Sequence, residues 1–302
     1  MLVPIAYRLL PGRRSLAAVD VILTVGAVSA ALGIFQYAIL EFDHLGRRPP
    51  GALGLYMTYA GLLMLVICMA AARILFRPRD RMWAALIMPA LLVAVTVTFT
   101  RSAWVGACAG VGLLFLLRDF RLIALLPVVA AVFLAVAPAR LSERLYSTFS
   151  VTDPSNRDRI AMMRAGVRMI GDRPLTGVGP DMVLRVYPEY RDEGAVHDVN
   201  PHLHNVPMQI AAERGLPALA IWIWFIVLLY RDFLRGLRPT TYPSLYAGGL
   251  AAVTAMLAAG LFEYNFGDSE FLMLFLILVT LPYAADRLPA PAGQAGRRPQ
   301  PA

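Results

Sequence analysis

Two histidines and an asparagine form the densest group of chemically useful side chains in this sequence. They lie in the segment Pro201-His202-Leu203-His204-Asn205, shortly before an apolar run at 216–230. An imidazole titrates near neutrality, so it can take a proton from a hydroxyl group and later release it. Ionisable groups where a polar loop enters an apolar segment are costly unless they are used. We therefore expect chemistry here, with His204 as the catalytic candidate.

Neighbouring residues offer other roles for the same site. His202 is the rival base and His197 is a weaker one, while Asn205 could orient the imidazole or a substrate hydroxyl. Glu189 is the carboxylate alternative if histidine only binds the substrate. The structural alternative is that His204 merely caps the helix that follows it.

Arginines around this segment indicate an anionic ligand. All 28 basic residues are arginine, whose planar guanidinium matches pairs of phosphate oxygens. Arg101 stands in a very short turn between two apolar runs, where it is either an interfacial side chain or a phosphate clamp. No acidic cluster has metal-ligand spacing, so we expect no metal and no cofactor.

The stretch 156–171 predicts an amphipathic helix, with Asp153 as its N-cap and Pro154 in its first turn. A helical wheel puts one group on a single side, opposite Met162, Met163, Met169 and Ile170: Arg157, Ala161, Arg164 and Arg168. This stripe is either a solvated face or part of a phosphate site. In the second case, the stripe would lie on the same side of the membrane as Arg101 and could hold an anion with it, with Arg168 as a possible supporting residue.

The composition is that of an integral membrane protein. The chain is 58% hydrophobic and only 16% charged, with a mean hydropathy of +0.61, whereas soluble domains carry about a quarter charged residues. The net charge of +8 is uninformative alone, because membrane topology concentrates arginine on one side. Cys68 and Cys108 both fall in apolar runs, which favours inert packing over a disulfide.

Eight apolar runs have spanning length, namely 16–40, 54–76, 82–99, 102–117, 122–138, 214–230, 244–262 and 271–285. The arginines of the short connections then all fall on one side, which the positive-inside rule assigns to the cytoplasm. Both termini would be cytoplasmic and the loop 139–205 periplasmic. The predicted division is five N-terminal helices (1–138), the loop (139–205), three C-terminal helices (206–287) and a disordered tail (288–302).

Four sequence blocks, in this order, resemble the O-antigen ligase and polymerase superfamily. The first, at 100–106, contains Arg101, and the second is the segment 173–180. The third runs from His204-Asn205 to Glu213-Arg214-Gly215, and the fourth is the turn 260–268. Each block is weak alone, but their shared order and topology are specific to the superfamily.

The resemblance implies an all-α, multi-pass glycosyltransferase of the inner membrane that needs no metal. Such enzymes move a glycan from undecaprenyl diphosphate to an acceptor hydroxyl on the periplasmic face. By position, Arg101 and Arg157 or Arg164 would hold the diphosphate, and His204 would be the essential histidine. Family members commonly have more spans, which implies that N-terminal helices are missing here. The expected partners are the lipid-linked donor, a glycan or lipid A core acceptor and the bilayer, without nucleic acid.

Other functions are kept as alternatives. Within the superfamily, the acceptor could be a lipid A core sugar, a growing polysaccharide or a protein. A different class is a transporter of a small anion, although transporters build sites at the membrane midplane from broken helices, and here the charges concentrate in one outer loop. The third alternative is an inactive truncated member that acts as a scaffold in a polysaccharide assembly complex.

Overall fold

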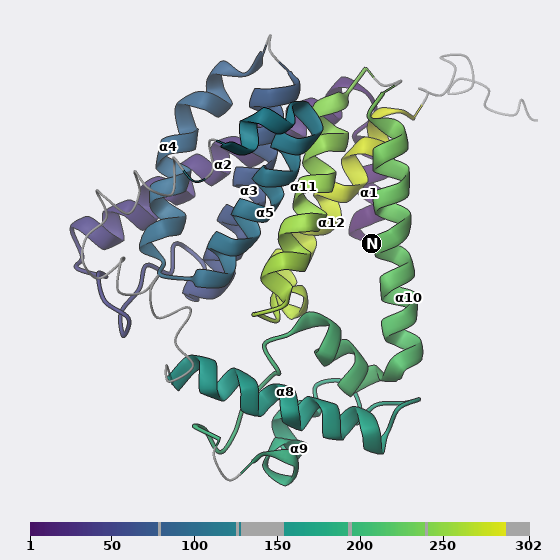
Figure 1. The fold of residues 1–302 in the computed structure, drawn as a ribbon. Coiled ribbons are helices and arrows are strands. Elements are labelled where there is room, and N and C mark those ends of the chain that lie inside the picture. The colour runs from purple at the N-terminus through teal and green to yellow at the C-terminus, as the bar shows by residue number, and fades with distance from the viewer. Residues whose placement is uncertain (78–79, 125–126, 128–153, 193–194, 239–240, 288–302) are drawn as a thin grey trace, which may run out of the picture.

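A computed structural model of the chain shows a helical bundle with a smaller helical region packed against one of its ends (Figure 1). It describes residues 1–77, 80–124, 127, 154–192, 195–238 and 241–287. Within these ranges the elements are α-helices and short 3-10 helices, with one isolated bridge and no strand. The predicted all-α class is confirmed.

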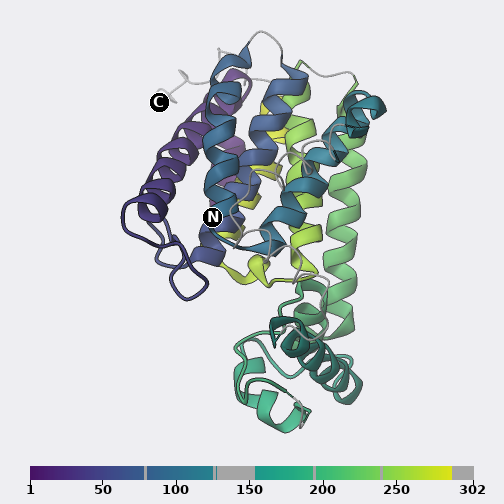
Figure 2. The same cartoon turned by 60° about the vertical axis from the view of Figure 1, so that its left-hand side comes forward.

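The helices follow the chain in a simple order. They are α1 (Leu2–Leu9), α2 (Arg13–Ala38), α3 (Tyr56–Phe76), α4 (Met82–Val97), α5 (Arg101–Arg118), η2 (Phe120–Ala124), α8 (Pro154–Asp172), α9 (Val183–Tyr190), α10 (Val206–Gly236), α11 (Pro243–Gly260), η4 (Asn265–Gly267) and α12 (Ser269–Ala285). Helices α8 and α9 lie beyond the bundle, as two views show (Figures 1 and 2).

Five of these helices are long and apolar enough to cross a membrane: α2, α3, α5, α10 and α11. Helices α4 and α12 are apolar but shorter. Together they correspond to seven of the eight predicted spans, and the remaining one, at 122–138, lies almost wholly outside the described residues. Helix α1 was not predicted from the sequence. The chain is a multi-pass membrane protein.

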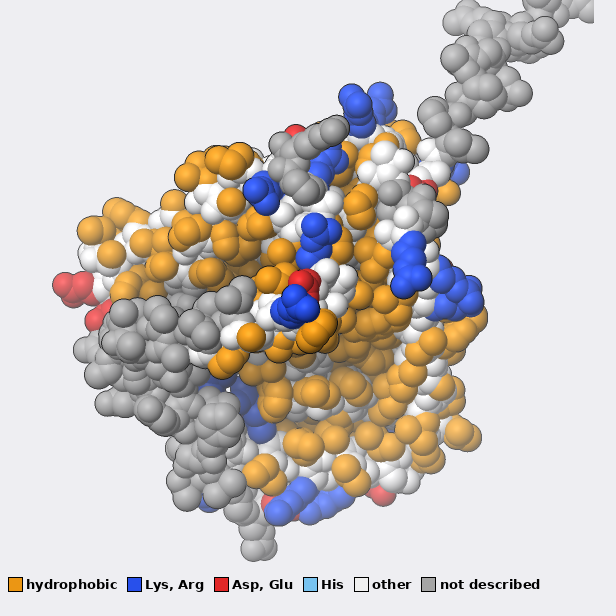
Figure 3. Space-filling view, turned by 45° about the horizontal axis from the view of Figure 1, so that its top comes forward, with side chains coloured by type: hydrophobic (Ala, Val, Ile, Leu, Met, Phe, Trp, Pro, Cys, Tyr) orange, Lys and Arg blue, Asp and Glu red, His pale blue; other side chains and the backbone are white. Residues whose placement is uncertain are grey.

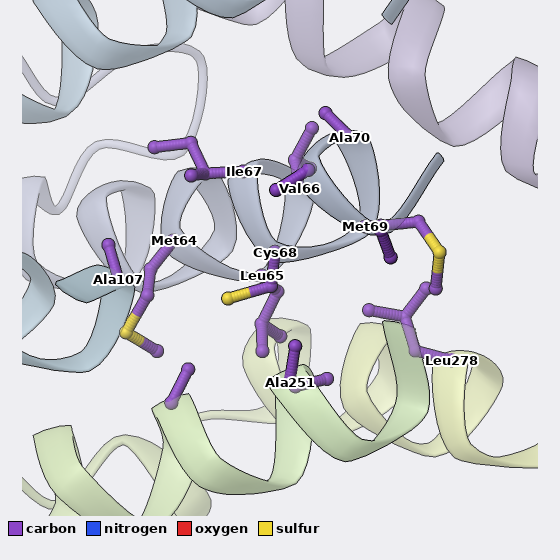
Figure 4. Packing of buried hydrophobic residues seen from close by; sticks show 14 of the residues in the cluster. Met64, Leu65, Val66, Ile67, Cys68, Met69, Ala70, Ala107, Ala251 and Leu278 are labelled. Atoms are coloured by element: carbon purple, nitrogen blue, oxygen red, sulfur yellow. The ribbon is translucent and has the colours of Figure 1, made fainter. Parts of the chain in front are cut away.

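Helices α3 and α11 form the centre of the bundle, and most of their residues are buried. Side chains of α3 pack between Ala107 of α5, Ala251 of α11 and Leu278 of α12 (Figure 4). Helices α5 and α11 approach most closely at Gly106 and Gly110, where an added methyl carbon would lie 2.8 Å from carbonyl oxygens of α11. Small residues spaced by four are the usual means of close helix contact in membranes.

A second close contact joins the segment 173–179 to α10. Gly215 interrupts α10 with φ 82° and ψ 169°, and the Leu216 amide donates to the Pro174 carbonyl at 2.7 Å. The Val178 amide donates to the Ala212 carbonyl at 2.8 Å. A methyl carbon on Gly215 would lie 2.2 Å from the Leu175 carbonyl oxygen. Glycine is therefore required by both conformation and space.

The predicted amphipathic helix is confirmed within α8, but its buried side differs from the prediction. Ala161 is buried although it was grouped with the arginines, and Met163 is 45% exposed although it was placed on the apolar side. The reason is steric: α8 approaches α10 closely at Gly166, where an added methyl carbon would lie 2.6 Å from the Met208 sulfur. Small residues, not only apolar ones, determine this face. The proposed cap Asp153 lies outside the described residues.

We expect Gly215→Ala to destabilise the protein, because alanine adds strain of about 1–3 kcal/mol in this backbone region and also meets the Leu175 carbonyl. Thermal unfolding of the detergent-purified protein measures the effect. The matched control is Gly171→Ala in α8, where an added methyl carbon meets nothing within 4 Å and helix propensity improves. Equal melting temperatures for the two variants would contradict this account.

Candidate active site

The two histidines singled out from the sequence lie beside a buried carboxylate at the end of the bundle that faces α8. The Nδ1 atom of His204 lies 2.8 Å from Oε1 of Glu263, and Nε2 of His202 lies 3.4 Å from the same oxygen. The two imidazole centroids are 4.3 Å apart. The His204 contact is close but falls outside hydrogen-bond alignment, and it is an ion pair only when the imidazole is protonated. One carboxylate thus serves two imidazoles.

Local hydrogen bonds position this group. Asn205 caps α10: its Oδ1 accepts from the Met208 amide at 2.9 Å, and its Nδ2 donates to the Leu261 carbonyl at 3.1 Å. The second bond ties the start of α10 to the turn that carries Glu263. His204 itself has φ 48°, an uncommon conformation for a residue with a side chain. Such conformations concentrate at functional sites, where the surroundings enforce them.

A series of buried hydrogen bonds along α10 also positions the segment that carries the histidines. The Leu203 amide donates to Gln209 Oε1 at 2.7 Å, and Gln209 Nε2 donates to Glu213 Oε1 at 2.8 Å. Arg214 Nη1 then donates to the other Glu213 oxygen at 3.0 Å. Gln209 and Glu213 are both 1% exposed. This chain holds the loop between the two histidines against α10.

The surroundings of Glu263 favour its ionised form despite its burial. It is 7% exposed, and burial, the largest single influence, opposes its charge. The interactions with His202 and His204 together outweigh that effect and hold the pKa of the carboxyl well below its usual range. A fixed negative charge therefore lies against both imidazoles.

Glu263 also lines a cavity of about 300 Å³ that contains three arginines. They come from three segments: Arg48 precedes α3, Arg101 is the first residue of α5, and Arg159 belongs to α8. Arg101 is 6% exposed and donates from Nη2 to Asn156 Oδ1 at 3.2 Å, which links α5 to the start of α8. The carboxylate is thus shared between the histidine pair and a basic cavity.

The cavity is electrostatically suited to an anion. Burial lowers the pKa of Arg48, the neighbouring Tyr56 opposes that effect and the charge of Arg101 adds to it. Arg48 also stacks on the Tyr56 ring at 4.3 Å from its centroid. Guanidinium groups that repel one another at a partly buried site are stabilised when an anion binds between them.

The arginines expected from the helical wheel lie elsewhere on α8. Arg157 and Arg164 line a separate cavity of about 230 Å³ with Asp192. Arg164 lies 3.4 Å from Asp192, and Arg168 pairs with the same carboxylate and donates to the Tyr190 carbonyl at 2.8 Å. The arginine of α8 that lines the same cavity as Arg101 is Arg159.

The remaining candidates lie at different distances from the histidine pair. His202 is in it, and its ring lies 5.9 Å from that of Tyr264. His197 instead pairs with the buried Asp158 of α8, its Nδ1 3.0 Å from the carboxylate. Glu189 is an exposed residue of α9. Asn205 uses both ends of its amide to hold the backbone.

Three of these groups offer ligand atoms that a metal ion could use. The atoms of His202, His204 and Glu263 lie within 4.8 Å of one another. However, the 2.8 Å separation of His204 and Glu263 is shorter than that of two ligands on one tetrahedral zinc, about 3.3 Å for bonds of about 2.0–2.1 Å. In the described part of the chain, these side chains therefore contact each other directly.

Sequence reasoning missed Glu263, Arg48 and Arg159 as site residues. Glu263 lies in a resembling block, but no spacing links it to residues sixty positions earlier. Arg159 carried a usable signal, because it falls on the methionine side of the wheel, where an arginine needs a polar partner. Arg48 lies in a connection where nothing in the residue pattern distinguishes it from Arg47.

Comparison with known proteins agrees with the motifs. Residues 90–223 match the family described as O-antigen ligase, a range that includes Arg101, α8 and His204 and ends inside α10. No curated protein matches the chain. The fourth block, with Glu263, lies beyond the matched range. The match and the order of the motif blocks agree that this part of the chain is similar to the O-antigen ligase family.

Proposed function

We propose that this protein transfers a glycan from undecaprenyl diphosphate to an acceptor hydroxyl, without a metal ion. The observation that carries the proposal is the position of Glu263, which contacts the histidine pair and also lines the cavity of Arg48, Arg101 and Arg159. A group that can take a proton thus adjoins a site that can hold a diphosphate. The family match supports a glycosyltransferase of this kind.

In the proposed reaction, the acceptor oxygen attacks the anomeric carbon of the donor glycan. The bond from that carbon to the diphosphate oxygen breaks, and its electron pair leaves with undecaprenyl diphosphate. His204 takes the acceptor proton. The Glu263 carboxylate favours a proton on the Nδ1 atom beside it, which leaves Nε2 of His204 free to act as the base. Glu263 is therefore a positioning residue.

The arginines would supply the second half of the catalysis. As the leaving diphosphate gains charge, guanidinium groups already oriented toward it stabilise that charge without reorganisation. Arg101 and Arg159 are the leading pair because they line one cavity, with Arg48 as a third contact. Arg157 and Arg164, with Arg168 in support, remain the alternative set, and their cavity is partly neutralised by Asp192.

The proposal also specifies the membrane face of the site and the class of acceptor. The site would face the periplasm of the inner membrane, because the connecting arginines lie at the other end of the bundle. The acceptor would be a lipid A core sugar or a growing polysaccharide. The anion transporter is disfavoured because the arginine cavity lies at the end of the bundle rather than at its midplane. A scaffold without activity is distinguished by the variants below.

We expect Arg101→Lys and Arg159→Lys each to reduce transfer about 10- to 100-fold, because losing one charge-assisted contact to the diphosphate costs roughly 1.5–3 kcal/mol. Lysine keeps the charge but loses the planar pair of donors. Glycan transfer in membranes that contain each variant measures the effect. Arg164→Lys is the matched control on the same helix, and a larger loss for it than for Arg159→Lys would favour the Arg157 and Arg164 assignment.

We expect His204→Ala to reduce transfer roughly 10²–10⁴-fold, which is the usual contribution of a general base. His202→Ala should be milder. Glu263→Gln should lower the turnover number, while binding of the lipid-linked donor, measured on the purified protein, should not weaken, because the three arginines remain and a negative charge beside them is lost. His197→Ala is the control, since this histidine pairs with Asp158 instead. A His204→Ala protein that inserts and turns over normally would exclude the proposed base.

Removing metal ions with a chelator distinguishes two roles for His204: a general base or a metal ligand. We expect activity to persist after dialysis against EDTA, because His204 and Glu263 contact each other directly. Elemental analysis of the purified active protein should then find less than one transition-metal ion per chain. Loss of activity on chelation, with recovery on adding zinc, would instead assign His202, His204 and Glu263 as ligands.

A further inference from the structure

The opposite end of the bundle contains a second basic cavity, which the proposed reaction does not use. It has a volume of about 730 Å³ and lies between the first turns of α2 and α4 and the last turns of α3. An adjoining cavity of about 530 Å³ shares Arg13 and Arg77 with it and extends to the start of α11. Arginine side chains lie among hydrophobic ones on this end of the molecule (Figure 3).

A buried arginine forms part of the cavity wall. Arg73 is 4% exposed, and its Nη2 lies 2.5 Å from Oδ1 of Asp20. Its Nε and Nη1 atoms are buried and have no hydrogen-bond partner among the described residues. A buried guanidinium with donors left over is costly, and Asp20 is itself half-exposed to solvent. An additional anion near Arg73 would therefore be stabilising.

A second buried polar group lines the adjoining cavity. The hydroxyl of Ser244, the second residue of α11, is buried and likewise lacks a hydrogen-bond partner among the described residues. This group comes from a different helix and is independent of Arg73. Two unsatisfied polar side chains in adjoining walls indicate a polar ligand with several acceptor atoms.

The charges identify the class of that ligand. Three arginines (Arg13, Arg73 and Arg77) face two carboxylates, because Asp20 pairs with Arg73 and Asp80 pairs with Arg77 at 2.5 Å. One positive charge is left over, which matches the single negative charge of a phosphodiester. Arginine is the side chain best suited to phosphate oxygens.

Apolar side chains next to the arginines favour an amphiphile. Leu16 and Trp83 line the main cavity, Phe76 lines the adjoining one, and Trp83 is 42% exposed at the bundle surface. Tryptophan is typical of the membrane interface, where lipid headgroups lie. We propose that this cavity binds the phosphodiester headgroup of an anionic glycerophospholipid and so joins the ends of α2, α3, α4 and α11.

The test uses the full chain purified in a neutral detergent, with short-chain phosphatidylglycerol as the probe and binding followed by microscale thermophoresis. We expect saturable binding that Arg13→Gln and Arg73→Gln each weaken about tenfold. Arg14→Gln is the matched control: it removes the same charge one residue away, outside the cavity lining. Because Arg73→Gln removes a buried ion pair and can impair folding, the exposed Arg13 provides the decisive variant.

Two further measurements distinguish a phospholipid from free phosphate as the bound ligand. Zwitterionic phosphatidylcholine should bind at least tenfold more weakly, and inorganic phosphate should not compete at millimolar concentration. Competition by inorganic phosphate that Arg13→Gln abolishes would retain the phosphate site but overturn the lipid as its occupant. Equal weakening by Arg13→Gln and Arg14→Gln would show unspecific charge attraction and overturn the site itself. Glycan transfer activity is a separate readout, so failure here leaves the proposed reaction unaffected.

Discussion

The candidate site depends on one buried carboxylate, Glu263, whose surroundings favour its charged form. A glutamate in an apolar environment would normally be neutral, because desolvation raises its pKa. Here the two imidazoles overcome that effect, and the pKa of Glu263 is lowered instead. The same charge borders the cavity of Arg48, Arg101 and Arg159. The electrostatics of the histidine pair and of the arginine cavity are therefore linked through a single side chain.

That arrangement requires segments far apart in sequence to be held at closely defined distances from one another. The segment 173–179 packs backbone to backbone on the kink of α10, which fixes the distance between α8 and the start of α10. Asn205 then joins the start of α10 to the turn after α11. Rigid connections of this kind, built from backbone contacts, hold side chains more accurately than long flexible loops do. The glycines and the asparagine of the motif blocks are thus supporting elements of the site.

Much of this could be predicted from the sequence, and the limits have physical causes. Apolar runs predict spans well because a lipid environment demands internal hydrogen bonding, and the short polar segment around His204 stands out against them. A helical wheel, in contrast, ranks residues by polarity, while α8 docks through Ala165 and Gly166. The pairing of His204 with Glu263 joins residues brought together by α10 and α11, which local periodicity cannot encode.

The two groups of arginines on and around α8 have different acidic neighbours. Asp192 pairs with Arg164 and Arg168, so these two side chains fasten the segment after α9 to α8. At the cavity of Arg101, by contrast, the carboxylate that the described residues contribute is Glu263, which also contacts two imidazoles. In the proposed reaction, a diphosphate bound in this cavity would share these arginines with Glu263, and its departure would leave Glu263 beside them as before.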